Sequence, residues 1–128
     1  MKVNFSATFM LTQTLFPLLQ AAPTASVIFT SSGVGSRPRA FWGAYALSKQ
    51  AVEGMSDIFT QETQKTTQLR FNCINPGATR TQMRATAYPS ENPNTIATPE
   101  DLMNAYVALM ADDSRAVKGQ VIDLQPKN

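Results

Sequence analysis

The sequence predicts an α/β fold that forms part of a doubly wound parallel sheet. Three short runs, at 26–32, 69–75 and 119–125, combine apolar and β-branched residues in the manner of strands. Segments in which apolar residues have helical spacing precede and separate these runs. Strands that alternate with helices are typical of parallel sheets, because a parallel connection needs a crossover that a helix usually provides.

The first element expected is an amphipathic helix near the amino terminus. Phe5, Phe9, Phe16 and Leu19 are spaced for one helix face. The segment resembles a secretory signal in outline, but polar residues such as Asn4 interrupt its apolar run. No stretch approaches the roughly 18 apolar residues needed to span a bilayer. We therefore expect a cytoplasmic protein with no membrane partner.

A strand, a loop and a second helix are expected next. The strand "SVIFTSS" at 26–32 is followed by "GVGSRPRAFWG" at 33–43, a glycine-rich segment that we interpret as a loop. From about 43 to 64, apolar residues recur on one helix face and polar residues on another. In this helix Tyr45 and Lys49 are neighbours at positions i and i+4, so their side chains share a face.

The rest of the chain supplies two strands and a third helix. "LRFNCIN" at 69–75 is a strand ended by a Pro-Gly pair, and "GQVIDLQ" at 119–125 is the last strand. The polar stretch at 80–97 has no clear period and is expected to be a long loop or lid with a short helix. Thr98 is a candidate N-cap and Pro99 the first helical residue, with two acids in the first turn.

Composition excludes several classes of function. The chain has 128 residues, 43% of them hydrophobic and 16% charged, so residues 1–128 are expected to form a single globular domain. It has no histidine, which removes Ser-His-Asp catalysis and most zinc catalysis, and no metal site is predicted. Its single cysteine, Cys73, is expected to be buried and unreactive. A net charge of +2 without a clustered basic stripe argues against nucleic-acid binding.

Three residues combine into a candidate catalytic group. Ser32 stands thirteen residues before Tyr45, at the carboxyl end of a predicted strand, where ligands of parallel sheets bind. A tyrosine side chain ordinarily titrates near pH 10 and is a poor base at neutral pH, but a nearby ammonium such as that of Lys49 favours the phenolate. The alternative is a surface aromatic, a solvated charge and a turn-forming serine.

At this point the sequence resembles the short-chain dehydrogenases/reductases, a family with a Rossmann-type sheet. The similarity is spread over the whole chain and is carried by "NFSATF", "IFTSSGVG", "YALSKQAVEGM", "NCINPGATRTQM" and "GQVIDLQP". The double glycine that usually follows the last strand of the family is absent. The residues of the segments "RAFWGAYALSK" and "NPGATRTQMRA" resemble those of a proteobacterial branch of this family.

The resemblance implies an oxidoreductase that acts on a small-molecule carbonyl or alcohol substrate. In that mechanism Tyr45 exchanges a proton with the substrate oxygen while a hydride moves to or from the nicotinamide of NAD or NADP. Ser32 hydrogen-bonds the substrate oxygen, and Lys49 also binds the nicotinamide ribose. Asn4 holds a water in a proton relay, although a helix N-cap is its alternative role.

The resemblance also implies a cofactor site and a quaternary structure. Pro76, Gly77 and the backbone near Thr79 would contact the nicotinamide ring, and Thr81 would reach its carboxamide or the pyrophosphate. The stretch after Thr81 would be the substrate lid, in which Arg84 suits an anion while Met83 and Tyr88 suit an apolar pocket. The residues favour neither. A homodimer or tetramer, paired through the helix that bears Tyr45, is expected of the complete enzyme.

The glycine-rich half of the family is absent. Family members are roughly twice as long, and their first half carries the glycine-rich turn that binds the cofactor pyrophosphate. We therefore expect only the last three strands of the sheet, with 27–30 as an unprotected edge and an exposed apolar flank. Two functions remain open: the catalytic half of an NAD(P)-dependent oxidoreductase, or a non-catalytic remnant with an interaction role. An epimerase or dehydratase is less favoured.

Overall fold

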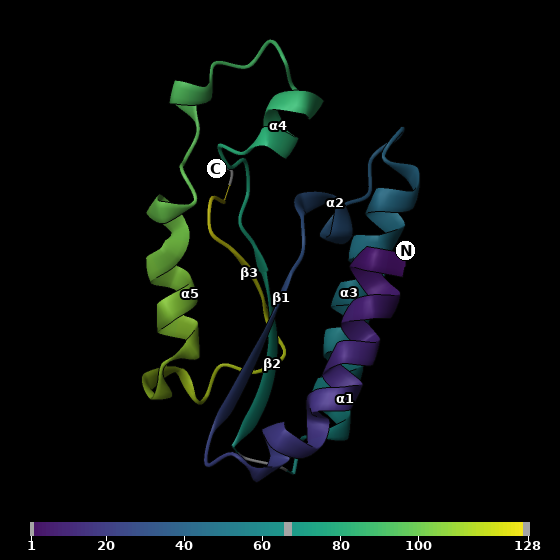
Figure 1. Ribbon diagram of the computed structural model, residues 1–128, viewed down its shortest axis with the longest axis vertical. Helices are drawn as coiled ribbons and strands as arrows, with labels where there is room; N and C mark the ends of the chain where they lie inside the picture. Colours follow the sequence, from purple (N-terminus) through teal and green to yellow (C-terminus); the bar gives the residue numbers. More distant parts are fainter. Residues whose placement is uncertain (1, 66–67, 127–128) are drawn as a thin grey trace.

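A three-stranded parallel sheet forms the centre of the protein. The computed structural model describes residues 2–65 and 68–126. Strands β1 (Ala25–Thr30), β2 (Leu69–Asn75) and β3 (Val121–Asp123) lie in the order β1-β2-β3. Figure 1 shows helices α1 and α3 on one side of this sheet and α5 on the other. The layered α/β arrangement with parallel strands confirms the predicted fold class.

The amino-terminal segment is helical, as its apolar spacing predicted. It begins with one turn of π-helix, η1 (Lys2–Ser6), and continues as α1 (Ala7–Ala21). Phe5, Phe16 and Leu19 pack against the core from this helix, and the ring of Phe9 stacks on that of Phe59. The opposite face of the helix carries exposed apolar side chains: Met10, Leu11, Leu15 and Leu18.

Strand β2 is the most buried element, because β1 and β3 flank it and helices cover both faces. Phe71 is fully buried, and its ring lies 6.2 Å from that of Phe29 and 5.1 Å from that of Phe59. Cys73 pairs with Phe29 across the sheet and is also fully buried, as predicted. The observed bounds of β2 equal the predicted ones, since an uninterrupted buried run ends where Pro76 removes a donor.

The connection between β1 and the next helix corrects the sequence prediction. Strand β1 ends at Thr30, two residues earlier than expected, and Gly33–Ser36 form a short helix, α2, in place of part of the predicted loop. Ser32 is the extended N-cap residue of α2. The turn packs closely on α3 (Gly43–Glu62), which begins at the expected residue and ends two residues earlier than expected. Close packing, which a local sequence pattern does not report, explains why 33–36 are ordered.

Two helices follow β2. The polar stretch contains α4 (Gln82–Ala87) and a 3-10 turn, η2 (Pro93–Thr95), in agreement with the expected loop and short helix. The third predicted helix begins as 3-10 turn η3 (Glu100–Leu102) and becomes α5 at Met103–Met110. A further turn, η4 (Asp112–Ser114), follows α5.

The third helix begins one residue later than predicted. Its first helical residue is Glu100, and Pro99 takes the N-cap position that was predicted for Thr98. Thr98 still bonds to the first turn: its backbone N–H donates to the Asp101 carboxylate at 2.9 Å, and the N–H of Asp101 donates to the Thr98 hydroxyl at 3.3 Å. This reciprocal pair satisfies two donors that a helix start leaves unpaired.

Among the described residues, β1 is an edge strand of the sheet, as predicted. Val27 and Ile28 are half-buried on it. Together with the apolar face of α1, this edge gives the expected exposed apolar flank. Within 2–65 and 68–126, no helix combines the length and the apolar character required to cross a membrane.

Candidate active site

The first turns of α3 bring Tyr45 and Lys49 together at the carboxyl edge of the sheet. The Lys49 Nζ lies 5.7 Å from the centroid of the Tyr45 ring. The same ammonium donates a hydrogen bond of 3.0 Å to the backbone carbonyl of Thr30, the last residue of β1. The predicted pair is therefore a fixed arrangement and not two independent surface groups.

Burial alters the electrostatics of this edge. Lys49 is half-buried, and desolvation lowers the pKa of its ammonium below the usual lysine value. Behind it, burial raises the pKa of the Cys73 thiol to about 11. Cys73 is thus a neutral thiol at physiological pH and contributes no charge next to the lysine.

Asn4 joins the same region through α3. Its Nδ2 donates to the Ser48 hydroxyl at 3.2 Å, and that hydroxyl donates to the backbone carbonyl of Tyr45 at 2.7 Å. Ser48 is buried, so this link fixes η1 against the helix that carries the tyrosine. A cavity of about 270 Å³ lies beside it, and its lining residues are Val3, Asn4, Thr8, Ile28, Phe29, Thr30, Lys49 and Val52.

The two adjacent serines after β1 have different environments. Ser31 is buried, and its hydroxyl donates to the Glu53 carboxylate at 2.5 Å, while Ser36 donates to the same oxygen at 3.0 Å. Ser32 is half-buried, and its hydroxyl makes no capping bond to α2. Ser31 therefore has a structural role in anchoring the turn. Within the residues that the structure describes, no hydrogen bond joins the Ser32 hydroxyl to Tyr45.

Glu53 is a positioning residue that sequence reasoning missed. It was assigned only to the polar face of the predicted helix, one turn beyond Lys49. Its carboxylate accepts hydrogen bonds from the hydroxyls of Ser31 and Ser36. These bonds hold the segment that contains Ser32 against α3. The available signal was its i+4 spacing from Lys49 together with a serine-rich turn whose hydroxyls need acceptors.

The Pro-Gly turn after β2 lies at the same edge of the sheet. Gly77 has φ 76°, and its N–H donates to the Asn75 side chain at 3.1 Å. The Thr79 hydroxyl donates to the Gly77 carbonyl at 3.0 Å. A Cβ on Gly77 would lie 3.0 Å from Gln125, so glycine is required both for the backbone conformation and for the space.

Gln125 was also missed. Its amide donates to the carbonyls of Pro76 and Ala78, at 2.8 Å in each case, and so fixes the turn. Gln125 follows β3, and the carboxyl ends of β2 and β3 lie at one edge because the strands are parallel. That topology was the signal for the contact.

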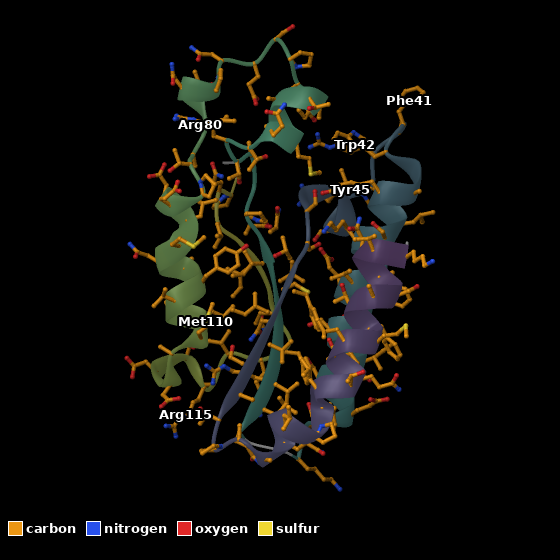
Figure 2. The ribbon with its side chains drawn as sticks, in the orientation of Figure 1. Phe41, Trp42, Tyr45, Arg80, Met110 and Arg115 are labelled. Atoms are coloured by element: carbon orange, nitrogen blue, oxygen red, sulfur yellow. The ribbon has the colours of Figure 1, made fainter. Side chains whose placement is uncertain are left out.

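Thr81 and Trp42 complete the surroundings. The Thr81 hydroxyl accepts the backbone N–H of Arg84 at 3.2 Å as the N-cap of α4. The Trp42 ring lies 5.9 Å from that of Tyr45 and 6.3 Å from that of Tyr88, which follows α4. Figure 2 shows Trp42 and Tyr45 close together near the start of α3. No sequence argument had selected Trp42.

Comparison with known proteins decides the family. The sequence profile of the short chain dehydrogenases matches residues 1–92. The chain belongs to the short chain dehydrogenase family. Membership confirms the resemblance that the five sequence segments indicated, and the parallel sheet is the corresponding part of the Rossmann-type fold of that family.

Relatives in this family are similar over almost the whole chain. The uncharacterized oxidoreductase YciK of Escherichia coli K12 is 55% identical over 126 residues, which are 98% of this chain and 49% of YciK. A short chain dehydrogenase structure from Salmonella enterica serovar Typhi has a TM-score of 0.94 at 55% identity and covers 97% of this chain. The predicted proteobacterial branch is thus the YciK branch.

A structure from E. coli CFT073, solved in complex with NADPH, has a TM-score of 0.92 at 55% identity over 97% of this chain. The matched region is 51% of that structure and 51% of the Salmonella protein. The chain therefore spans about half the length of the family members that it matches.

Proposed function

We propose that the chain supplies the catalytic residues of an NAD(P)-dependent oxidoreductase, which moves a hydride between nicotinamide and a small carbonyl or alcohol substrate. The observation that carries this proposal is the Lys49 ammonium, held by the Thr30 carbonyl at 3.0 Å and placed 5.7 Å from the Tyr45 ring centroid. A cation fixed beside a tyrosine favours transfer of the phenolic proton, because it stabilises the negative charge left on the oxygen.

Each catalytic residue has one role in the proposed mechanism. Tyr45 exchanges a proton with the substrate oxygen as acid or base, and Lys49 stabilises the phenolate charge. The Ser32 hydroxyl donates a hydrogen bond to the substrate oxygen. It is suited to this role because it makes no capping bond to α2. Asn4 and Lys49 line the cavity of about 270 Å³, a volume large enough for the water of a proton relay.

The carboxyl edge fits a nicotinamide. The main chain of Gly77 is exposed, and the Gln125 amide holds the turn in place, so a flat ring could lie against the backbone of Pro76, Gly77 and Thr79. Thr81 would bind the carboxamide or the pyrophosphate of the cofactor, and Lys49 would bind its ribose. When bound, the cofactor supplies or accepts the hydride. The E. coli CFT073 relative in complex with NADPH and a Shigella flexneri relative in complex with NADP support this assignment.

A second candidate is a non-catalytic role, in which residues 1–128 form one domain without the glycine-rich half and act as an interaction segment. The exposed apolar side chains of α1 and the edge of β1 favour it. The same surfaces are consistent with a catalytic half that packs against further strands. In the complete enzyme, we propose a cytoplasmic homodimer or tetramer paired through α3, where Gly54 leaves room for a close helix contact.

Cofactor titration tests the catalytic proposal against the non-catalytic one. The chain is titrated with NADPH and NADH while nicotinamide fluorescence is followed, and the double variant Tyr45→Phe, Lys49→Ala is compared with it. A matched control, Tyr106→Phe, Lys65→Ala, changes the same residue types on α5 and beyond the end of α3. Saturable binding that only the first variant loses supports the catalytic role. Absence of binding up to millimolar cofactor would mean that cofactor affinity requires the glycine-rich half, and hydride transfer with that half supplied then decides between the two roles.

A further inference from the structure

The segment after β2 reaches the candidate active site through aromatic contacts. We use the term Trp42 cluster for Tyr45, Trp42, Tyr88 and Arg84. Trp42 is half-buried, and its ring makes a tilted contact with that of Tyr45, at an interplanar angle of 48°, and a stacked contact with that of Tyr88, at 29°. The Arg84 guanidinium lies over the ring of Tyr88, 3.8 Å from its centroid. A substrate group that extends from Tyr45 toward α4 would therefore meet the Trp42 ring.

Arg84 is paired with an acid within its own segment. Its Nε and Nη2 donate to the two carboxylate oxygens of Glu91, at 2.8 Å in both cases. This bidentate pair is the strongest geometry that a guanidinium forms with a carboxylate. The pair compensates the charge of Arg84, and Tyr88 covers one of its faces. An anionic substrate would meet a guanidinium whose charge Glu91 already compensates.

The neighbouring Arg80 is directed elsewhere. Its Nε donates to the Pro93 carbonyl at 2.7 Å, which ties the loop to the end of β2. In Figure 2, Arg80 lies toward α5, on the other side of α4 from Trp42 and Tyr45. The hollow lined by Arg80, Arg84 and Glu91 measures about 140 Å³, below the volume of an ordinary small-molecule site. Its one carboxylate pairs with Arg84, and Arg80 donates to a backbone carbonyl.

We infer that the site selects neutral carbonyl compounds that carry an aromatic or other flat apolar group, and that Trp42 is the residue that determines this specificity by stacking on that group. The inference rests on the proposed function, because it places the substrate oxygen at Tyr45. Within the cluster, Tyr88 and Arg84 support the Trp42 ring from behind, while Glu91 keeps Arg84 from attracting anions. Offset or tilted contacts with aromatic rings are favourable beyond the burial of apolar area.

Trp42 provides a direct probe, since it is the only tryptophan in the sequence. The chain is titrated with methyl benzoylformate and with benzoylformate, which share an aryl ketone and differ in a neutral ester against a carboxylate. N-acetyltryptophanamide, titrated in parallel, corrects for light absorption by the ligands. We expect saturable quenching by the ester, with a dissociation constant at least about tenfold lower than that of benzoylformate.

Two variants separate stacking from charge. Glu91→Gln removes the carboxylate that compensates Arg84, so benzoylformate should bind about fivefold more tightly while the ester changes less than about twofold. Tyr88→Leu removes the ring behind Trp42 and should weaken binding of the ester by about fivefold. Tyr106→Phe, on α5, is the control that should change neither ligand. Circular dichroism verifies that each variant is folded.

Equal binding of the two ligands, tighter binding of benzoylformate, or no quenching by either would overturn the inference. Its failure is distinguishable from failure of the proposed function, because quenching requires neither cofactor nor hydride transfer. Preferential binding of the ester, together with no hydride transfer once the glycine-rich half is supplied, would leave the inference standing and refute the proposed function. Hydride transfer without preference for the ester would refute the inference alone.

Discussion

Replacement of Gly35 by alanine should destabilise the protein through the contact between α2 and α3. A Cβ at Gly35 would lie 2.7 Å from Ser31 Oγ, 2.9 Å from the Glu53 carboxylate and 3.1 Å from Lys49 Cβ. The first two atoms are joined by a hydrogen bond of 2.5 Å, and the third is fixed to the helix backbone. None of the three can withdraw without loss of a contact.

The expected magnitude follows from these contacts. Loss of a hydrogen bond to a charged group costs about 1.5 to 3 kcal/mol, and crowding of a packed site adds about 1 kcal/mol or more. Alanine stabilises a helix by about 1 kcal/mol relative to glycine, which offsets part of this loss. The net destabilisation should therefore be about 2 kcal/mol. Because Ser32 lies in the displaced segment, the substitution should also disturb the candidate active site.

Urea unfolding followed by circular dichroism measures this effect. Gly33→Ala, two residues earlier in the same turn, is the matched control, because a Cβ there would meet only the Asn75 side chain at an ordinary 3.7 Å. With a urea m-value of about 2 kcal/mol/M, Gly35→Ala should lower the unfolding midpoint by about 1 M. Gly33→Ala keeps the gain in helix propensity without the crowding, so it should raise the midpoint by up to about 0.5 M. A midpoint for Gly35→Ala equal to that of the parent would refute the close packing of α2 on α3.

Three further predictions concern stability. Phe71→Ala should cost about 3 to 5 kcal/mol in urea unfolding, because Phe71 is fully buried between two rings, whereas exposed Phe41→Ala should cost almost nothing. Arg70→Met should cost about 2 kcal/mol, since the buried guanidinium donates to the last carbonyls of α5, and a loss no greater than that of exposed Arg115→Met would contradict this role. Cys73 has a folded-state pKa of about 11 against an ordinary 9.0, so the folded protein retains a proton that the unfolded chain loses. The contribution of Cys73 to the free energy of unfolding should be complete below pH 9 and should decrease by about 2 to 3 kcal/mol as the pH rises to 11. The free energy of unfolding of Cys73→Ala should not show this decrease.

The sequence was sufficient wherever a local pattern carried the information. The bounds of β2 and the start of α3 were predicted correctly, because a continuous apolar run and a helical period are local signals. Tyr45 and Lys49 share a helix turn, so their contact also followed from spacing alone. The start of the third helix was indicated to within one residue for the same reason.

Contacts between distant segments were not accessible in that way. The turn at 33–36 is helical because Gly35 fits against α3, and Ser31 is held by Glu53, which lies 22 residues further along the chain. Gln125 reaches the Pro-Gly turn only because β2 and β3 are parallel neighbours. Trp42 gains its role from Tyr88, which the fold brings to the start of α3.

Hydride transfer by a chimera tests the central claim, that Tyr45 is the acid or base of an oxidoreductase, most directly. The chimera joins the preceding half of YciK, which this chain matches over 49% of its length, to this chain. NADPH oxidation is followed with a panel of neutral and anionic carbonyl compounds. We predict transfer that decreases about 100-fold or more in Tyr45→Phe and is unchanged in Tyr106→Phe. Equal rates for the chimera and its Tyr45→Phe variant would contradict the assignment of Tyr45.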